Sequence, residues 1–382
     1  MNKHFNLLFL ASENLLRHRT KTIVVCLCIV AILTPFITAI AISEGVRAQS
    51  LTSVNAGADL YLTFDEFGRN AAVPLKYLDE IKKIFGVTKV VPRIIGRGFL
   101  QNKLAVIVGI TKEDIPESVS CISGRMFENA NEVVVGHELA RHFNLNIGDQ
   151  FSMRCQQRKI FTVVGFFSSD AGIWGASMIF MSFKDAGELF GKQAVATDIQ
   201  IHSLPGHNSA IATDLYDILQ NEPYRLQDKH MAELYIKKGF MLKEGIFSAL
   251  YMVAFALGVP AILVASGFGL SDRKKEIGIM KATGWQTLEV LELISFEQLL
   301  ISLLGATIAI VLSILWIKGF NGAFVAQFFI AEITMLPKFT LPARFLPLPC
   351  LLSFFFAFLL TMVGSVYFSW RASTESPVAS MK

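Results

Sequence analysis

Four long apolar runs constrain the fold of this chain more than any other feature of its sequence. The first, residues 22–43, holds 22 residues without a charged side chain. As a helix it would span roughly 33 Å, enough to cross the hydrocarbon core of a bilayer. The others are residues 244–270, 287–317 and 345–370. The whole chain is 53% hydrophobic and only 17% charged, and most of the excess of apolar residues lies in these runs. This composition excludes a single soluble domain of average composition. The sequence predicts four transmembrane helices.

Basic residues set the direction of these helices. They gather in three segments, residues 1–21, 271–286 and 371–382. Since positive charge favours the cytoplasmic side, both termini are expected inside the cell, with residues 44–243 and 318–344 outside. The net charge of +4 is modest, and its clustering beside the spans indicates topology rather than a nucleic-acid-binding surface.

The N-terminal part of the chain admits more than one interpretation. Residues 1–21 show apolar side chains at helical spacing with interspersed basic residues, which predicts an amphipathic helix on the inner membrane face; a disordered tail is the alternative. Ala39-Ile40-Ala41 resembles a signal-peptidase site. The apolar run is longer than the apolar core of a typical signal peptide, so a retained span is favoured, with a kink expected at Pro35.

Residues 44–243 have the composition of a water-soluble domain. Seven segments have strand composition: residues 58–64, 87–91, 104–110, 132–135, 160–166, 176–181 and 197–202. Three have helical patterns: residues 74–85, 182–190 and 209–220. This mixture predicts an α+β domain inserted between the first and second spans. Residues 230–244 continue a helical pattern into the second span and predict a stalk.

The extracytoplasmic region contains candidate residues for a disulfide and for a metal site. Cys121 and Cys155 form a candidate disulfide, since disulfides persist outside the cytosol. His137 and His142 enclose a motif like that of zinc proteases, but at i and i+5 they would diverge by about 140° on a helix. The chain contains no Walker A loop and no dinucleotide-binding fingerprint. The sequence thus predicts no enzyme and no metal site in this chain.

The spans themselves carry small and polar residues in patterns typical of helix packing. Gly258 and Pro260 suggest a bend in the second span. Gly305, Ala309 and Ser313 repeat every four residues in the third, a stripe that lets helices approach closely. Glu297 lies about two turns inside the cytoplasmic end of that span. Two interpretations stay open for it: a buried, paired acid, or an acid at the membrane interface.

Residues 272–285 form a short charged segment between two spans. Four of its residues are basic, and Ile277 and Met280 fall near helical spacing. We interpret it as a short helix across the inner mouth of the spans, which Gly284 is placed to end. The alternative is an ordinary charged loop that only sets topology.

This segment resembles the loop between the second and third spans of MacB/FtsX-type (type VII) ABC transporter permeases: a basic cluster, Glu-Ile-Gly, then Ala-x-Gly. Fragments in the extracytoplasmic domain and the tail support the resemblance. They are Gly57-Ala58-Asp59-Leu60, Gly124-Arg125-Met126-Phe127, Glu132 to Gly136 with Leu139, Ala140, Leu145, Gly148 and Asp149, Phe161 to Gly165, and Arg371-Ala372 with Pro377-Val378.

The resemblance implies a non-catalytic permease subunit whose loop docks on a separate ATPase subunit, two copies per complex, which binds ATP and Mg²⁺. It also implies a bacterial inner-membrane location, contact with membrane lipid, a second permease chain (homodimer or heterodimer), a MacB-like domain of two lobes, and in some members a periplasmic adaptor and outer-membrane channel. The residues it places at the ATPase are Arg273, Lys274, Lys275, Glu276, Ile277, Gly278, Met280, Lys281 and Gly284.

By the same resemblance, the complex performs mechanotransmission: ATP hydrolysis drives export or extraction outside the membrane, of a drug, peptide, haem or lipoprotein. Two alternatives stay open. One is an FtsX-like regulator that transports nothing and controls an extracytoplasmic enzyme. The other is a membrane-anchored sensor or adhesion protein without an ATPase.

Overall fold

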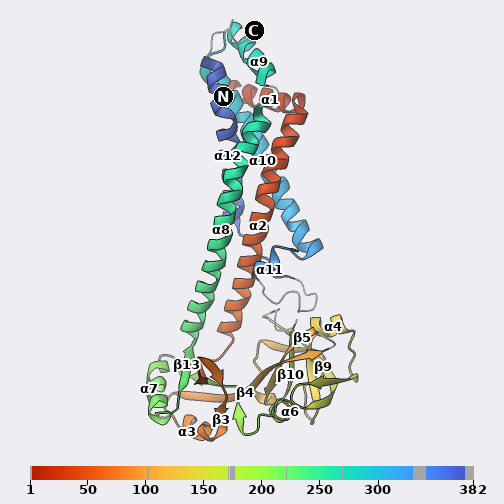
Figure 1. Cartoon of the computed structure of the whole chain (residues 1–382), viewed down its shortest axis with the longest axis vertical. Coiled ribbons are helices and arrows are strands. Elements are labelled where there is room, and N and C mark those ends of the chain that lie inside the picture. The colour runs from red at the N-terminus through yellow and green to blue at the C-terminus, as the bar shows by residue number, and fades with distance from the viewer. Residues whose placement is uncertain are drawn as a thin grey trace. The chain divides into compact units, whose positions relative to one another are not determined.

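The computed structural model describes residues 2–100, 103–170, 172, 177–220, 222–267, 270–329 and 341–374. They fall into two compact units, and each is described by itself. The helical unit holds Met1–Glu44, Leu242–Phe329 and Ala343–Lys382, and the β-rich unit holds Gly45–Met241. In Figure 1 the colour of their helices and strands runs from red at the N-terminus to blue at the C-terminus.

The helical unit is built around long apolar helices. Its helices, two of which begin or end in the β-rich unit, are α1 (Asn2–Arg17), α2 (Arg19–Asn55), α8 (Lys229–Gly267), α9 (Leu270–Ala282), α10 (Thr287–Phe320), α11 (Ala326–Phe329) and α12 (Pro347–Thr374). Among the described residues, three helical stretches are long and apolar enough to cross a membrane: Arg19–Asn55, Lys229–Gly258 and Thr287–Phe320. A shorter apolar stretch, Pro347–Val363, lies where the fourth span was expected.

Small residues on α10 allow close packing against α2. Ile29 on α2 is 1% exposed, and a Cβ added at Gly305 would lie 2.9 Å from its Cγ2. Two turns further along α10, Ser313 Oγ and Thr38 Oγ1 form a buried hydrogen bond of 2.8 Å. Ala309 between them is fully buried. The predicted stripe of small residues therefore faces α2, and it carries a polar contact between the two helices.

Helix α8 meets α2 and α12 at a glycine. A Cβ at Gly258 would lie 2.4 Å from Ile32 Cδ1 and 3.9 Å from Leu360 Cδ1, so only glycine fits without displacement. Pro260 is exposed within α8, and Pro35 lies inside α2. Helix α8 begins at Lys229 and continues without a break through the predicted stalk.

The β-rich unit contains strands and short helices. The strands are β1 (Leu60–Glu66), β2 (Arg69–Ala71), β3 (Val73–Pro74), β4 (Val87–Leu100), β5 (Lys103–Ile110), β6 (Val119–Gly124), β7 (Glu132–Gly136), β8 (Gln150–Arg154), β9 (Arg158–Ser169), β10 (Met178–Ser182), β11 (Val195–Ala196), β12 (Asp198–Ser203) and β13 (Tyr224–Asp228). The helices are η1 (Leu75–Tyr77), α3 (Leu78–Ile81), η2 (Lys112–Asp114), α4 (His137–Phe143), α6 (Phe183–Leu189) and α7 (Asn208–Ile218).

Within the described residues, the main sheet has the order β13-β1-β12-β4-β5-β10-β7-β9-β6. Its long strand β4 divides it into two lobes: residues 87–93 pair with β12, and residues 94–100 pair with β5. We call the β12 side the first lobe and the β5 side the second lobe. Each has its own hydrophobic core, around Leu62 and Ile201 in the first lobe and around Phe161 and Val163 in the second. The chain of the second lobe lies between β4 and β12, as an insertion.

All seven strands expected from the sequence are present, whereas several polar strands were missed. The first five residues of β6 read Val-Ser-Cys-Ile-Ser, and every residue of β6 after Val119 is exposed. Strand β13 is similarly polar and lies at the other end of the sheet order. Edge strands bury few side chains, so they lack the apolar alternation by which a strand is recognised.

The candidate disulfide between Cys121 and Cys155 is not formed, and both cysteines are free. Strand β9 explains why. Cys121 pairs with Phe167 near one end of β9, whereas Cys155 follows Arg154, which pairs with Arg158 at the other end. Nine residues of strand separate these positions by roughly 30 Å. A disulfide requires Cα atoms within about 7 Å, so the structure excludes this candidate pair, which the sequence had left open.

Two glycines singled out in the sequence face each other in the second lobe. Gly124 has a φ of +79°, and a Cβ there would lie 2.3 Å from Val164 O. A Cβ at Gly165 would lie 2.3 Å from Arg125 O. Close approach of the β6 end to β9 therefore excludes side chains at both positions. The hydrogen bond from Arg125 N to Val164 O, 3.0 Å long, lies at this crossing.

Arg125 and Glu132, from two different sequence fragments, form one charged cluster. Glu132 accepts hydrogen bonds from both terminal nitrogens of Arg125 and from the backbone N–H groups of Glu128 and Asn129. The Arg125 guanidinium does most to hold the pKa of Glu132 far below its usual range, and these backbone donors add to it. The carboxylate thus fixes the loop that leads from β6 into β7.

Replacing Glu132 by glutamine should destabilise this lobe. The loss of charge-assisted hydrogen bonds is expected to cost about 2–3 kcal/mol. Thermal unfolding of the purified full chain at pH 7 should show the change as a midpoint about 5–10 °C lower. Glu128→Gln is the control, because Glu128 is 53% exposed and should contribute little.

The same variant has an expected pH dependence. Because the folded-state pKa of Glu132 is depressed, its contribution is complete above the ordinary value of 4.5 and declines as the pH falls below it. Wild type and Glu132→Gln should therefore converge in stability below pH 4.5. A constant difference from pH 7 down to pH 3 would contradict the assignment.

Candidate functional site

Helix α9, the charged segment predicted between two spans, is anchored by one apolar face. Ile277 is 1% exposed and packs with Val290 and Ile294 of α10. Met280 and Trp285 cover the same cluster. The helix ends at Ala282, after which Gly284 takes a φ of +98° and Trp285 N donates to Met280 O over 3.0 Å. Gly284 therefore ends the helix, as expected from the sequence.

Glu276 of α9 faces the junction of α1 and α2. Its Oε1 lies 3.2 Å from His18 Nε2 and 3.7 Å from Arg17 Nη1. Its side chain is 21% exposed. Glu276 is thus engaged inside this chain and positions α9 against α1. The resemblance places Glu276 among the residues that contact an ATPase, and that assignment stays a prediction.

Helix α1 is also attached to α10. Asn14 Nδ2 donates to Glu297 Oε1 over 2.9 Å, and His4 contacts Glu292. Glu297 is 6% exposed. Two interpretations of Glu297 were left open, and the structure shows the first: the acid is buried and has a partner. The apolar side of α1, with Leu7 and Ala11 buried against Leu293, completes this contact.

The outward side of α9 carries the remaining described residues. Lys275 is exposed, Ile279 is 56% exposed, and Gly278 is buried. Lys281 is half-buried. The side chains of Arg273 and Lys274 lie outside the part of the chain that the structure describes, although their backbone belongs to α9. Lys275 and Ile279 are therefore exposed side chains of α9.

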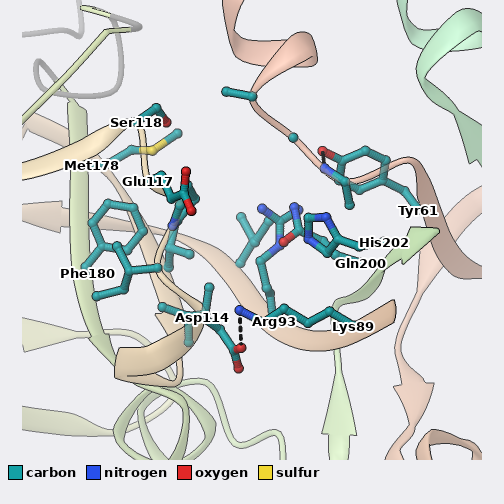
Figure 2. A pocket seen from close by; sticks show the side chains of 18 of the residues that line it. Tyr61, Lys89, Arg93, Asp114, Glu117, Ser118, Met178, Phe180, Gln200 and His202 are labelled. Carbon is teal, nitrogen blue, oxygen red and sulfur yellow. Dashed lines mark hydrogen bonds and ion pairs between the residues drawn. The ribbon is translucent and has the colours of Figure 1, made fainter. Parts of the chain in front are cut away.

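A second candidate site is a cleft of about 960 Å³ in the β-rich unit, between its two lobes (Figure 2). Its first-lobe wall is the polar face of β1, β4 and β12, with Arg93 and His202 pointing into the space. Its second-lobe wall is apolar and comes from β5 and β10, including Val108 and Phe180. The loop after β5 closes one side, where Lys89 Nζ contacts Asp114 Oδ1 across the lobes at 2.8 Å.

The polar wall of this cleft is held in place by interactions within the first lobe. Arg93 donates to both carboxylate oxygens of Asp198, at 3.0 and 2.6 Å, and its guanidinium lies 5.6 Å from the centre of the Tyr61 ring. Burial lowers the pKa of His202, which favours the neutral imidazole. The bidentate pair and the ring fix Arg93 in one orientation.

The sequence did not predict this cleft. Residues 198–202 alternate polar and apolar, and such alternation predicts a strand with one solvated face. In the structure the polar face is itself covered, since Gln200 is 5% exposed and Asp198 is 9% exposed. No local pattern reveals that a second lobe, inserted in the middle of the domain, folds over that face.

Two family models match the chain. The MacB-like periplasmic core domain matches residues 22–212, half of the chain, and the FtsX-like permease C-terminal model matches residues 248–377. The chain belongs to the MacB/FtsX-type permeases. It is accordingly a transmembrane permease of the ABC transporter type with a periplasmic domain.

Two solved structures are similar to the periplasmic part of this MacB/FtsX-type permease. The periplasmic region of MacB from Actinobacillus actinomycetemcomitans is 16% identical with a TM-score of 0.37, covering 49% of this chain and 97% of that one. The extracellular domain of the noncanonic ABC-type transporter YknZ from Gram-positive bacteria is 13% identical with a TM-score of 0.35, covering 44% and 99%. No curated protein matches the chain.

The two candidate sites fall in different matched regions of the permease. Helix α9 lies inside the FtsX-like match, and most of the cleft lies inside the MacB-like match. The glycines and the Arg125–Glu132 cluster lie in the MacB-like match as well. Some residues of the fragments that carried the resemblance thus fix backbone geometry.

Proposed function

We propose that this chain is the non-catalytic permease subunit of an ABC transporter, and that a separate ATPase subunit docks on α9. The observation that carries the proposal is the construction of α9. Its apolar side is anchored on α10 through Ile277, Glu276 holds it to the α1–α2 junction, and Lys275 and Ile279 are left exposed. A short helix fixed on two sides can transmit a push from a bound partner to α1 and α10 together.

The proposed topology follows from the distribution of charge and of apolar helices. The chain crosses the inner membrane four times, with α2, α8, α10 and α12 as the spans and both termini in the cytoplasm. Because α9 connects α8 and α10, it then lies on the cytoplasmic side, where ATP is available. Two ATPase copies and a second permease chain complete the proposed complex, and the ATPases hold ATP and Mg²⁺.

The proposed work is done on the outer side. Closure of the ATPases on ATP moves α9, and the displacement passes along α8 into the β-rich unit, which then expels or extracts a substrate. Membership in an ABC-type permease family supports the proposal that an ATPase subunit is a partner. An adaptor and an outer-membrane channel belong to the proposal only in a cell with two membranes.

Co-purification tests this proposal. The full chain, purified from its native membrane in mild detergent, should retain a protein with a Walker A loop, identified by mass spectrometry. ATP hydrolysis by the complex should respond to the permease, exceeding or falling below that of the isolated ATPase. Recovery of the chain without any ATPase would contradict the proposal and favour a sensor or adhesion protein. Recovery with an ATPase and a cell-wall enzyme would favour a regulator.

A further inference from the structure

Helices α2 and α8 join the sheet of the β-rich unit at neighbouring positions. Helix α2 ends at Asn55, and residues 56–59 connect it to β1. Strand β13 passes directly into α8, which begins at Lys229. Because β1 and β13 are antiparallel partners and Leu60 pairs with Asp228, both junctions lie at the same end of this strand pair. The two helices therefore meet the sheet at one place.

Asp59, the last residue of the α2–β1 connection, contacts both junctions and a third element. Its backbone carbonyl oxygen accepts a hydrogen bond of 3.2 Å from the N–H of Lys229, the first residue of α8. Its Oδ1 lies 3.2 Å from Lys229 Nζ. Its Oδ2 accepts a hydrogen bond of 2.9 Å from the N–H of Ser203, the last residue of β12, which is the other neighbour of β1. Asp59 therefore ties the start of α8 to β12 as well as to the end of α2.

The residues before Asp59 hold the connection in one conformation. Ala58 is fully buried, and its N–H donates a hydrogen bond of 3.1 Å to the hydroxyl oxygen of Tyr61. A Cβ added at Gly57 would lie 2.0 Å from that oxygen, so a side chain at this position would displace Tyr61. The backbone of Asp59 is therefore fixed by contacts that its own carboxylate does not make.

The first turn of α8 depends on residues outside the helix. The first N–H groups of a helix have no acceptor within it. In α8, the N–H of Lys229 donates to Asp59 O, and the N–H of Met231 donates to Asp228 Oδ1 over 2.6 Å. Because both acceptors belong to β13 or to the α2–β1 connection, they attach the start of the helix to the sheet.

We propose that Asp59 is a mechanical joint that makes the end of α2, the start of α8 and strands β1 and β12 one rigid body. A displacement that passes along α8 then enters the sheet at β1 and β12, instead of being absorbed by fraying of the first turn of α8. The role of this joint rests on the proposed function for the source of the displacement. Its rigidity requires neither ATP nor an ATPase, so the joint is testable on the permease alone.

Amide hydrogen exchange of the full chain in phosphatidylcholine nanodiscs, without an ATPase, tests the joint. Exchange is read by mass spectrometry with fragmentation to single residues. The variant Asp59→Ala removes both carboxylate contacts and leaves the backbone carbonyl. Exchange of the amides of Lys229 and Met231 is expected to become at least about fivefold faster, because the first turn of α8 then opens more often. Wild-type exchange at both amides overturns the proposal.

Asp65→Ala is the matched control, because Asp65 makes the same kinds of contact at the far end of β1. It accepts a hydrogen bond from the N–H of Gly68 and pairs with Arg225 of β13. The side chains of Asp65 and Asp59 are each 28% exposed. The two variants should lose similar thermal stability, whereas exchange at the start of α8 should accelerate in Asp59→Ala alone. Equal acceleration there in both variants indicates general loosening of the sheet and overturns the proposal.

Lys229→Met keeps the test decisive if Asp59→Ala fails to fold. It removes the contact between Nζ and the Asp59 carboxylate and keeps the length of the side chain. Exchange at the start of α8 should become at least about twofold faster, and Lys229→Arg, which can restore the ion pair, should exchange like wild type. Wild-type exchange in Lys229→Met overturns the proposal.

The complex with its ATPase tests the path of the displacement. Addition of ATP and vanadate should change amide exchange in α8 and in β12 of the wild type, and Asp59→Ala should keep the change in α8 and lose that in β12. A change in β12 that survives Asp59→Ala overturns the proposed path. A wild type without a change in either element contradicts the proposed function instead, and the measurement without an ATPase still decides the joint.

Discussion

Replacing Lys275 by glutamate should weaken binding of the ATPase subunit by more than about tenfold, because a like-charge contact at an interface costs several kcal/mol. Lys275 is exposed on α9 beside the buried Ile277, so the change leaves the apolar anchor of the helix intact. The measurement is a titration of purified ATPase against the full chain in nanodiscs, read by biolayer interferometry.

Two variants control this experiment. Lys238→Glu makes the same change of charge at an exposed position of α8 and should bind like wild type. Glu276→Gln removes the charge from the contacts with His18 and Arg17 but leaves the anchor at Ile277 in place, so it should lower affinity by less than about threefold. Wild-type affinity in Lys275→Glu would remove α9 as the docking element. A larger loss in Glu276→Gln than in Lys275→Glu would contradict the orientation described for these side chains.

Glu276 illustrates what the sequence could and could not predict about this site. The apolar spacing of Ile277 and Met280 and the position of Gly284 were sufficient to predict a short helix and its end. Which charged residue faces a partner depends on the rotation of α9 about its axis. That rotation is set by Val290 and Ile294, which follow the segment in the chain and show no local sign of contact with it.

The β-rich unit likewise has parts that the sequence could predict and parts that it could not. Its central strands were predictable because they alternate or run apolar, and its edge strands were not. Whether Cys121 and Cys155 pair could not be decided from the sequence, because it does not show where each cysteine lies along β9. The cleft lies between two lobes that share β4, and Gln200 on its wall is 5% exposed. Long-range topology of this kind leaves no local pattern.

Inserting three glycines after Lys238 should uncouple the β-rich unit from the ATPase. Helix α8 runs without a break from Lys229 to Gly267, and each inserted glycine weakens a helix by about 1 kcal/mol relative to alanine. In the complex with its ATPase, addition of ATP and vanadate should change amide hydrogen exchange in the β-rich unit of the wild type. The variant should lose that change while retaining ATP hydrolysis within about twofold, because a flexible joint does not transmit a displacement.

Inserting three alanines at the same place is the matched control, since it shifts the helix equally but keeps it stiff. Gly239→Ala provides the opposite change: nothing lies within 4 Å of a Cβ there, so it should stiffen α8 at no steric cost and preserve the response to ATP. If the glycine and alanine insertions lose the response equally, the length or rotation of α8 matters and its stiffness does not. If the glycine insertion keeps the full response, α8 is not the element that carries the displacement.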